Sequence, residues 1–121
     1  MTEDTLDGSA IDRLFATIED RKAADPEESY TARLYARGRA KIAQKTGEEA
    51  VETIIAAMAG DAEEVAKESA DLLYHLLVLW SEAGVCPADV YARLAKREGI
   101  SGLEEKRRRG GGRDFGGSSR A

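Results

Sequence analysis

Residues 68–80 read ESADLLYHLLVLW, and this stretch decides the fold class of the chain. It is the most apolar part of a segment that runs from Asp61, a good helix N-cap, to Ala83, where Gly84 supplies a stop. Wound as a helix, its leucines and Trp80 cover nearly the whole circumference and not one stripe. A helix that is apolar all round has to be surrounded by other helices. We therefore expect a helical bundle that a homodimer, or a higher oligomer, completes.

Helical periodicity and capping residues predict three further helices in the rest of the chain. One follows Ser9 and ends near residue 25, a long one spans 29–58, and one runs from Pro87 to about Gly99. Two glycines lie inside the long one, at positions 38 and 47, so a kink or break is expected near either. No stretch alternates in the manner of a strand. The predicted fold class is all-α, a small helical bundle of about four helices.

The composition separates an acidic body from a basic tail. The chain has 121 residues and a formal net charge of −5, and 42% of its residues are apolar but only 6% aromatic. Residues 104–121 read EEKRRRGGGRDFGGSSRA. This Arg/Gly-rich segment has little to bury, so we expect one folded domain over 1–103 and a largely mobile tail. We expect no nucleic-acid partner, because an acidic body does not suit a phosphate backbone.

Three features favour a cytoplasmic protein without a membrane segment. Cys86 is the only cysteine and cannot form an internal disulfide, which fits a reducing compartment. The N-terminal residues MTEDTLDGSA are acidic and polar, unlike a signal peptide. The longest apolar run, from Leu76 to Trp80, is far too short to cross a bilayer.

Five acidic residues are spaced so that they face one another across a helical hairpin. Glu48, Glu49 and Glu52 are three or four positions apart on the long helix. Glu68 and Asp71 repeat the three-residue spacing on the next helix, and the short connection makes the two helices antiparallel neighbours. The ordinary alternative for a Glu-rich helix is a solvated charged face. Apolar neighbours argue against it here, since unpaired acids beside a core are unfavourable.

Converging carboxylates repel one another and are stabilised by cations. Oxygen ligands without His or Cys favour Mg²⁺, or Mn²⁺, over zinc. A Mg²⁺ ion held by carboxylates keeps positions open for phosphate oxygens and for a water molecule that it can activate. A di-iron bundle also uses helical carboxylates but needs Glu-x-x-His pairs, whereas the only histidine, His75, follows Asp71 by four positions.

In the spacing of its acidic residues the sequence resembles the MazG-like superfamily of all-α nucleoside triphosphate pyrophosphohydrolases. The resemblance lies in E-E-x-x-E at 48–52 and E-x-x-D at 68–71. More specifically, the chain resembles the phosphoribosyl-ATP pyrophosphatase family. The segments that carry this are SYTARLYARG at 29–38, KIAQKTGEEAVETIIAA at 41–57, ESADLLYHLLVLW at 68–80 and the ending REGISGLEEKRRR at 97–109.

The resemblance implies hydrolysis of phosphoribosyl-ATP to phosphoribosyl-AMP and pyrophosphate, the second step of histidine biosynthesis. It implies that Mg²⁺ is bound by Glu49, Glu52, Glu68 and Asp71. By the same analogy Glu48 is a further, catalytic acid that positions water or a second ion.

Four basic residues form a candidate substrate-binding row. Arg33, Arg37, Lys41 and Lys45 recur every four residues, and Glu49 continues the series. On an unbroken helix such a row drifts only ~40° per step, so a cationic strip ~18 Å long would lead into the carboxylates. That would suit phosphoribosyl-ATP, which has a second, distant phosphate. A break at the glycine between the arginines and the lysines would leave only the lysines aligned, and the ordinary alternative is a solvated basic stripe.

Two other functions share part of this pattern. A house-cleaning pyrophosphohydrolase of nucleoside triphosphates would have the same bundle and metal site. A non-catalytic helical dimerisation module would instead use the basic tail to contact nucleic acid, with salt-sensitive binding and no Mg²⁺-dependent turnover. His75 also has two interpretations: it either hydrogen-bonds the Asp71 carboxylate or lies in the helical core or dimer interface.

Overall fold

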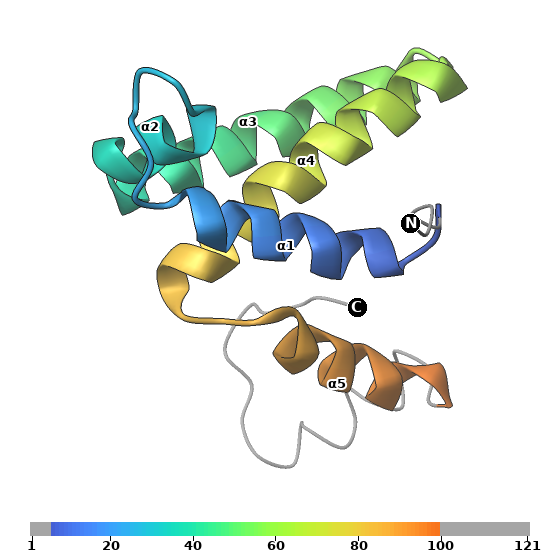
Figure 1. Cartoon of the computed structure of the whole chain (residues 1–121). Coiled ribbons are helices and arrows are strands. Elements are labelled where there is room, and N and C mark those ends of the chain that lie inside the picture. The colour runs from blue at the N-terminus through green and yellow to red at the C-terminus, as the bar shows by residue number, and fades with distance from the viewer. Residues whose placement is uncertain (1–5, 100–121) are drawn as a thin grey trace, which may run out of the picture. The chain divides into compact units, whose positions relative to one another are not determined.

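The computed structural model describes residues 6–99, and every regular element in that range is an α-helix (Figure 1). The helices are α1 (Ser9–Arg21), α2 (Tyr30–Arg37), α3 (Arg39–Met58), α4 (Ala62–Ala83) and α5 (Pro87–Glu98). The all-α prediction is confirmed, but the expectation of about four helices is corrected to five over the described range. The predicted tail, 104–121, and the domain boundary after 103 lie outside the described residues.

The additional helix arises at Gly38, where the long helix expected over 29–58 is interrupted. The φ angle of Gly38 is 96°, in a region that residues with a side chain rarely adopt. Its amide donates to the carbonyl oxygen of Leu34 at 3.2 Å, which closes α2, and α3 begins at the next residue. Gly47 stays inside α3 without interrupting it. The break therefore turns the chain between α2 and α3 at a single residue.

Helices α3 and α4 form the antiparallel hairpin expected to carry the acids (Figure 1). Gly60 turns the chain with a φ angle of 78°. The side chain of Asp61 then caps α4 by accepting from the amide of Glu64 at 3.1 Å. At the other end Gly84 adopts the left-handed conformation and stops the helix. Both predicted ends of this helix are confirmed, and its register against α3 follows from the short turn.

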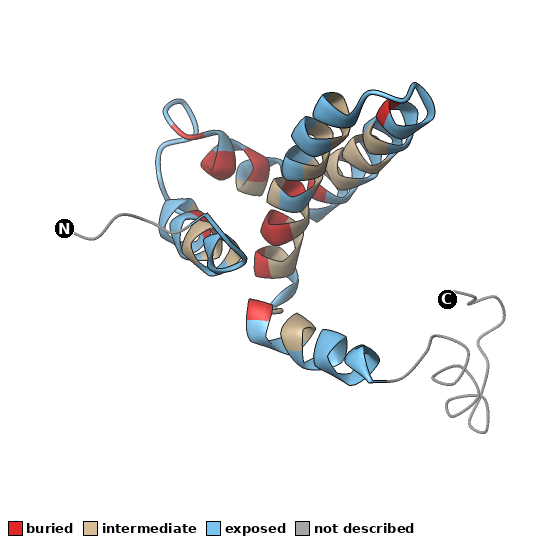
Figure 2. Ribbon diagram, turned by 90° about the vertical axis from the view of Figure 1, so that its right-hand side faces the viewer, coloured by how far each residue is buried: buried red, intermediate tan, exposed pale blue. Residues whose placement is uncertain are grey.

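An aliphatic core packs the C-terminal half of α4 against α1, α2 and α3. It consists of Ile18 from α1, Leu34 from α2, Ile42 from α3, and Leu77 and Val78 from α4. Burying each such side chain contributes about 1.5–3 kcal/mol. The outer part of the hairpin, toward its turn, is mostly exposed or half-buried (Figure 2). The core therefore fixes one end of the hairpin and leaves its other end accessible.

The chain divides into a unit that ends at Pro87 and a unit that begins at Ala88. Helix α5 starts at Pro87 as predicted, because proline suits the first position of a helix, and the rest of α5 is the described element of the second unit. Its last residue is Glu98, next to the predicted stop at Gly99. Among the described helices, none combines the length and the apolar character that crossing a membrane requires.

Candidate metal centre

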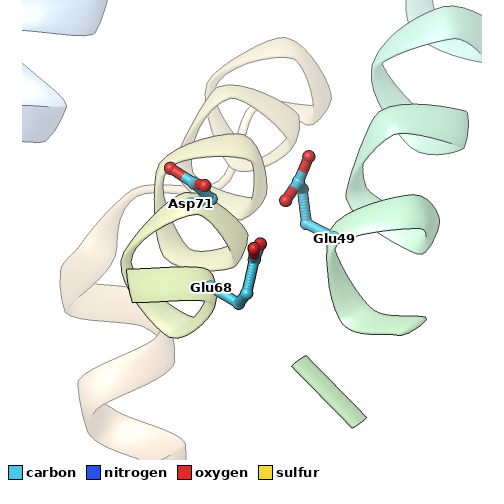
Figure 3. Close-up of side chains that lie close together, drawn as sticks. All are labelled: Glu49, Glu68 and Asp71. Carbon is cyan, nitrogen blue, oxygen red and sulfur yellow. The ribbon is translucent and has the colours of Figure 1, made fainter. Parts of the chain in front are cut away.

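Three of the five predicted acids come together between α3 and α4. Glu49 extends from α3, and Glu68 and Asp71 extend from successive turns of α4 (Figure 3). One carboxylate oxygen of each residue lies within 4.8 Å of those of the other two. Glu49 and Glu68 are half-buried and Asp71 is exposed. The three acids, called the acid triad below, are thus partly shielded by the hairpin and accessible from solvent at Asp71.

The chemistry of the acid triad fits a divalent cation that prefers oxygen ligands. Mg²⁺ binds oxygen at about 2.0–2.1 Å, so two ligands on opposite sides of the ion are about 4 Å apart. The three carboxylate oxygens all lie within 4.8 Å of one another, close enough to reach one ion after side-chain adjustment. The triad contains no imidazole or thiolate, the ligands that structural zinc sites favour.

The charge of the acid triad is a second reason to expect a cation. The pKa of Glu49 is raised above its ordinary value, mainly by burial; His75 opposes the rise, and the negative charges of Asp71 and Glu68 add to it. A raised pKa means that the ionised carboxylate is disfavoured in its surroundings. A divalent cation among the three carboxylates reverses that effect, because it stabilises the ionised forms.

One basic residue that the sequence analysis did not consider lies at the edge of the acid triad. Nζ of Lys67 is 3.6 Å from Oε2 of Glu68 and 3.7 Å from Oε2 of Glu64. The pKa of Lys67 is raised, by Glu64 first and by Glu68 second. Its side chain is 64% exposed, so water screens both pairs. Lys67 therefore balances the charge of the triad only weakly.

The other two predicted acids, Glu48 and Glu52, are not members of the triad. Glu48 is exposed, and its carboxylate accepts from Nε2 of Gln44 at 2.7 Å and pairs with Nζ of Lys45 at 3.2 Å. These partners hold the pKa of Glu48 below its ordinary value, Gln44 being the larger cause. Glu52 is exposed, three positions beyond Glu49 on α3. The roles assigned to Glu48 and Glu52 stay predictions.

The four basic residues of the predicted row do not lie on one helix. Arg33 and Arg37 belong to α2, and Lys41 and Lys45 belong to α3, with the break between them. The unbroken strip of ~18 Å is therefore excluded. Only the lysines keep their helical spacing to the acids of α3. Nε of Arg33 donates instead to the carbonyl oxygen of Pro26 at 3.1 Å.

His75 lies in the helical core, and both of its ring nitrogens have partners. Nδ1 is 2.9 Å from the main-chain carbonyl oxygen of Asp71, and Nε2 is 3.2 Å from the hydroxyl oxygen of Tyr30. The hydrogen bond to Asp71 thus goes to the backbone and not to the carboxylate. Sequence reasoning did not single out Tyr30. The available signal was an aromatic residue directly after Ser29, the N-cap of α2.

A comparison with protein families shows where a chain with this site belongs. The model of a family described as phosphoribosyl-ATP pyrophosphohydrolase matches residues 11–98, a span that includes every candidate site residue. The chain belongs to this family.

Curated relatives agree with membership of the phosphoribosyl-ATP pyrophosphohydrolase family. A phosphoribosyl-ATP pyrophosphatase of Azospirillum brasilense is 61% identical over 109 residues, which are 90% of this chain and 98% of the relative. One of Paramagnetospirillum magneticum is 56% identical over 103 residues, covering 85% and 94%. One of Rhizorhabdus wittichii is 64% identical over 96 residues, covering 79% and 91%. The resemblance drawn from the sequence motifs is therefore confirmed.

Proposed function

We propose that this chain hydrolyses phosphoribosyl-ATP to phosphoribosyl-AMP and pyrophosphate, the second step of histidine biosynthesis. The family match over residues 11–98 carries the proposal. The relatives that cover nearly the whole domain bear the name of the same enzyme. We also assign the reaction to the cytoplasm, a reducing compartment that suits a sequence with a single cysteine, Cys86.

Glu49, Glu68 and Asp71 are the proposed ligands of Mg²⁺, and Mn²⁺ would suit the same oxygens. Glu52 is proposed as a fourth ligand, because it follows Glu49 by three positions and shares its side of α3. The support is the spacing of the triad oxygens and the raised pKa of Glu49. When bound, the ion would supply positive charge for the polyphosphate and acidify a coordinated water.

The reaction adds water across the anhydride bond between the α and β phosphates of the substrate. The water oxygen forms a new bond to phosphorus, the anhydride bond breaks, and one proton is released. The α phosphate stays with phosphoribosyl-AMP, and the β and γ phosphates leave as pyrophosphate. Glu48 is the proposed acceptor of a hydrogen bond from the attacking water, because Gln44 and Lys45 favour its ionised form.

The basic residues at the start of α3 are the proposed contacts for the substrate phosphates. Lys45 and Lys41 lie one and two helical turns before Glu49 on α3, and both side chains are half-buried. A lysine so placed acts on a phosphate as a point charge. Arg33 and Arg37 are proposed as further contacts from α2, on the other side of the break.

A homodimer is the proposed assembly, formed through an exposed apolar row on α3. Val51, Ile54, Ile55 and Met58 follow the spacing of one helical face, and their side chains are 53% to 82% exposed. Leu73 of α4 is also exposed. A contiguous apolar surface favours association, and a second copy is the natural occupant, since small chains gain buried area in this way. Four of the exposed large apolar side chains thus lie on α3, whereas the apolar pattern of the sequence placed the dimer surface on the next helix, 61–83.

The release of pyrophosphate, measured with and without Mg²⁺, tests the proposed reaction. We expect Mg²⁺-dependent turnover of phosphoribosyl-ATP with a higher kcat/KM than for ATP, dUTP or dCTP. If these triphosphates were hydrolysed with equal or higher kcat/KM, the chain would be a general nucleotide pyrophosphohydrolase, contrary to the proposal.

A further inference from the structure

Tyr30 connects α2 to the turn of α4 that carries Asp71. Its hydroxyl oxygen lies 3.2 Å from Nε2 of His75, and Nδ1 of His75 lies 2.9 Å from the main-chain carbonyl oxygen of Asp71. Tyr30 and His75 are 45 positions apart in the sequence, so this is a tertiary contact. The three residues form a continuous hydrogen-bonded path from the first residue of α2 to a member of the acid triad.

The partners of His75 determine the direction of both hydrogen bonds. A carbonyl oxygen only accepts, so in the neutral imidazole the proton is on Nδ1 and is donated to Asp71. Nε2 is then the acceptor, and the hydroxyl of Tyr30 donates to it. His75 is only 6% exposed, so water competes poorly for its ring nitrogens, whereas the Tyr30 residue itself is 45% exposed. The ring orientation of His75 is therefore fixed from both sides.

Aromatic packing fixes the Tyr30 ring as well. It stacks on Tyr74 with the ring centroids 6.1 Å apart, and it meets the His75 ring edge-on at 5.9 Å. Tyr74 forms a second link between the same helices, since its hydroxyl lies 2.6 Å from Oγ1 of Thr31. Two phenol groups thus connect α2 with α4. Of these hydrogen bonds, only that of Tyr30 goes to His75, whose Nδ1 lies 2.9 Å from the carbonyl oxygen of Asp71.

We infer that Tyr30 is a positioning residue for the divalent cation, because it fixes through His75 the turn of α4 from which Asp71 reaches Glu49 and Glu68. The inference rests on the metal centre of the proposed function. Residues that hold metal ligands in place typically change metal affinity by about 10–100-fold when they are replaced. His75 contacts the main chain of Asp71 and not its carboxylate, so an effect near the lower end, about tenfold, is expected.

Direct titration of the full chain with Mn²⁺, followed by the electron paramagnetic resonance signal of the free ion, tests this role. Tyr30→Phe should raise the Kd for Mn²⁺ about tenfold. The matched control is Tyr74→Phe, which also removes one phenol hydrogen bond between α2 and α4 but leaves His75 held. Both variants should lose some thermal stability, and only Tyr30→Phe should bind the ion more weakly. Equal Kd values in the two variants would overturn the inference.

A double variant tests whether the effect passes through His75. Asparagine has no atom in place of Nε2, so His75→Asn also removes the acceptor for Tyr30. Because both single variants lose the same hydrogen bond, Tyr30→Phe combined with His75→Asn should bind Mn²⁺ no more weakly than His75→Asn alone. Additive losses would contradict the path.

The outcomes also separate this inference from the proposed function. If the wild-type chain binds Mn²⁺ and releases pyrophosphate, and Tyr30→Phe binds Mn²⁺ equally well, the inference fails and the proposed function stands. If the wild-type chain binds no Mn²⁺, the proposed metal centre and the inference fail together.

Discussion

Glu49 and Asp71 belong to different helices, yet a carboxylate oxygen of each lies within 4.8 Å of the other. Two like charges at this separation oppose the folded state, and the same pair favours the binding of a cation. Glu68, the third member of the triad, pairs with Lys67, but that lysine is 64% exposed and solvent screens the pair. Removing one of these charges should therefore favour the stability of the metal-free protein, whereas it should lower the metal-dependent activity.

The replacement Asp71→Asn keeps the shape of the side chain and removes its charge. We expect Mg²⁺-dependent release of pyrophosphate to be abolished, while the Tm of the metal-free protein holds or rises. Glu52→Gln should also abolish turnover if Glu52 is the fourth ligand. Glu63→Gln, an exposed acid of α4 outside the triad, serves as the control and should keep its activity. Near-normal turnover in both Asp71→Asn and Glu52→Gln would refute the metal centre.

Two adjacent acids should give opposite pH dependences of stability in the absence of divalent cations. The pKa of Glu49 is raised from 4.5, so its contribution becomes unfavourable as the pH rises from 4.5 through the folded-state value. The pKa of Glu48 is lowered from 4.5, so its contribution is present above 4.5 and is lost as the pH falls through the folded-state value. At neutral pH Glu49→Gln should therefore raise the Tm, and Glu48→Gln should lower it slightly.

The measurement is thermal unfolding of the wild type and both variants with a chelator, from acidic to neutral pH. Each difference from the wild type should disappear at the acidic end, where the carboxylates are protonated in both states. A Tm difference of the same sign for the two variants would contradict the assigned surroundings of these carboxylates.

The lysines of α3 should matter most for the substrate with a distant phosphate. We expect Lys41→Ala and Lys45→Ala to lower kcat/KM for phosphoribosyl-ATP at least tenfold, equivalent to about 1.4 kcal/mol of transition-state stabilisation. Residual hydrolysis of ATP should be less affected by Lys41→Ala, and Lys41→Arg should restore part of the loss. Equal losses on both substrates would show that Lys41 does not contact the distant phosphate.

Replacing each of two glycines by alanine should change the free energy of unfolding in opposite directions. Gly38→Ala places a side chain at a φ angle of 96°, which should destabilise the fold by about 1–3 kcal/mol. Gly47→Ala lies inside α3, where alanine should stabilise the helix by about 0.5–1 kcal/mol. The space around both positions is open, so the difference comes from the backbone. Urea unfolding measures both, and a destabilised Gly47→Ala would contradict the continuous helix.

The apolar row on α3 predicts a dimer in solution. Light scattering of the wild type should give twice the chain mass of 13.1 kDa at micromolar concentration. Ile54→Lys places a charge in the centre of the row and should produce monomers. Leu94→Lys, at an exposed leucine of α5, is the control and should leave the dimer intact. A wild-type monomer would refute the proposed interface.

Local signals predicted the hairpin well, and tertiary contacts account for what was missed. Asp61 and Gly84 mark the ends of α4 by capping chemistry, which depends only on neighbouring residues. Sequence did not distinguish Gly38 from Gly47 as the break, because both are glycines within one periodic pattern. Nor did it predict that Gln44 and Lys45 engage Glu48, since spacing defines a helical face but not the direction of a flexible carboxylate.

The contact of Tyr30 with His75 was beyond sequence reasoning for a related reason. The two residues are 45 positions apart, and their pairing depends on how α2 packs after the break. Family motifs contain both residues without indicating that they touch.

The hydrogen bonds of His75 also bear on which metals this protein can discriminate against. It is the one histidine of the chain, with Nδ1 2.9 Å from a carbonyl oxygen and Nε2 3.2 Å from a phenol oxygen, so in the neutral imidazole both nitrogens are engaged. The affinity of a site for copper, nickel or zinc ions exceeds its affinity for Mg²⁺ most strongly where an imidazole or thiolate ligand is available. Because both ring nitrogens of His75 already have hydrogen-bond partners, a transition metal that binds at the acid triad is offered carboxylate oxygens and no imidazole nitrogen. The hydrogen bond between Tyr30 and His75 thereby reduces the difference in affinity between the scarce transition metals and Mg²⁺, which is abundant in a cell.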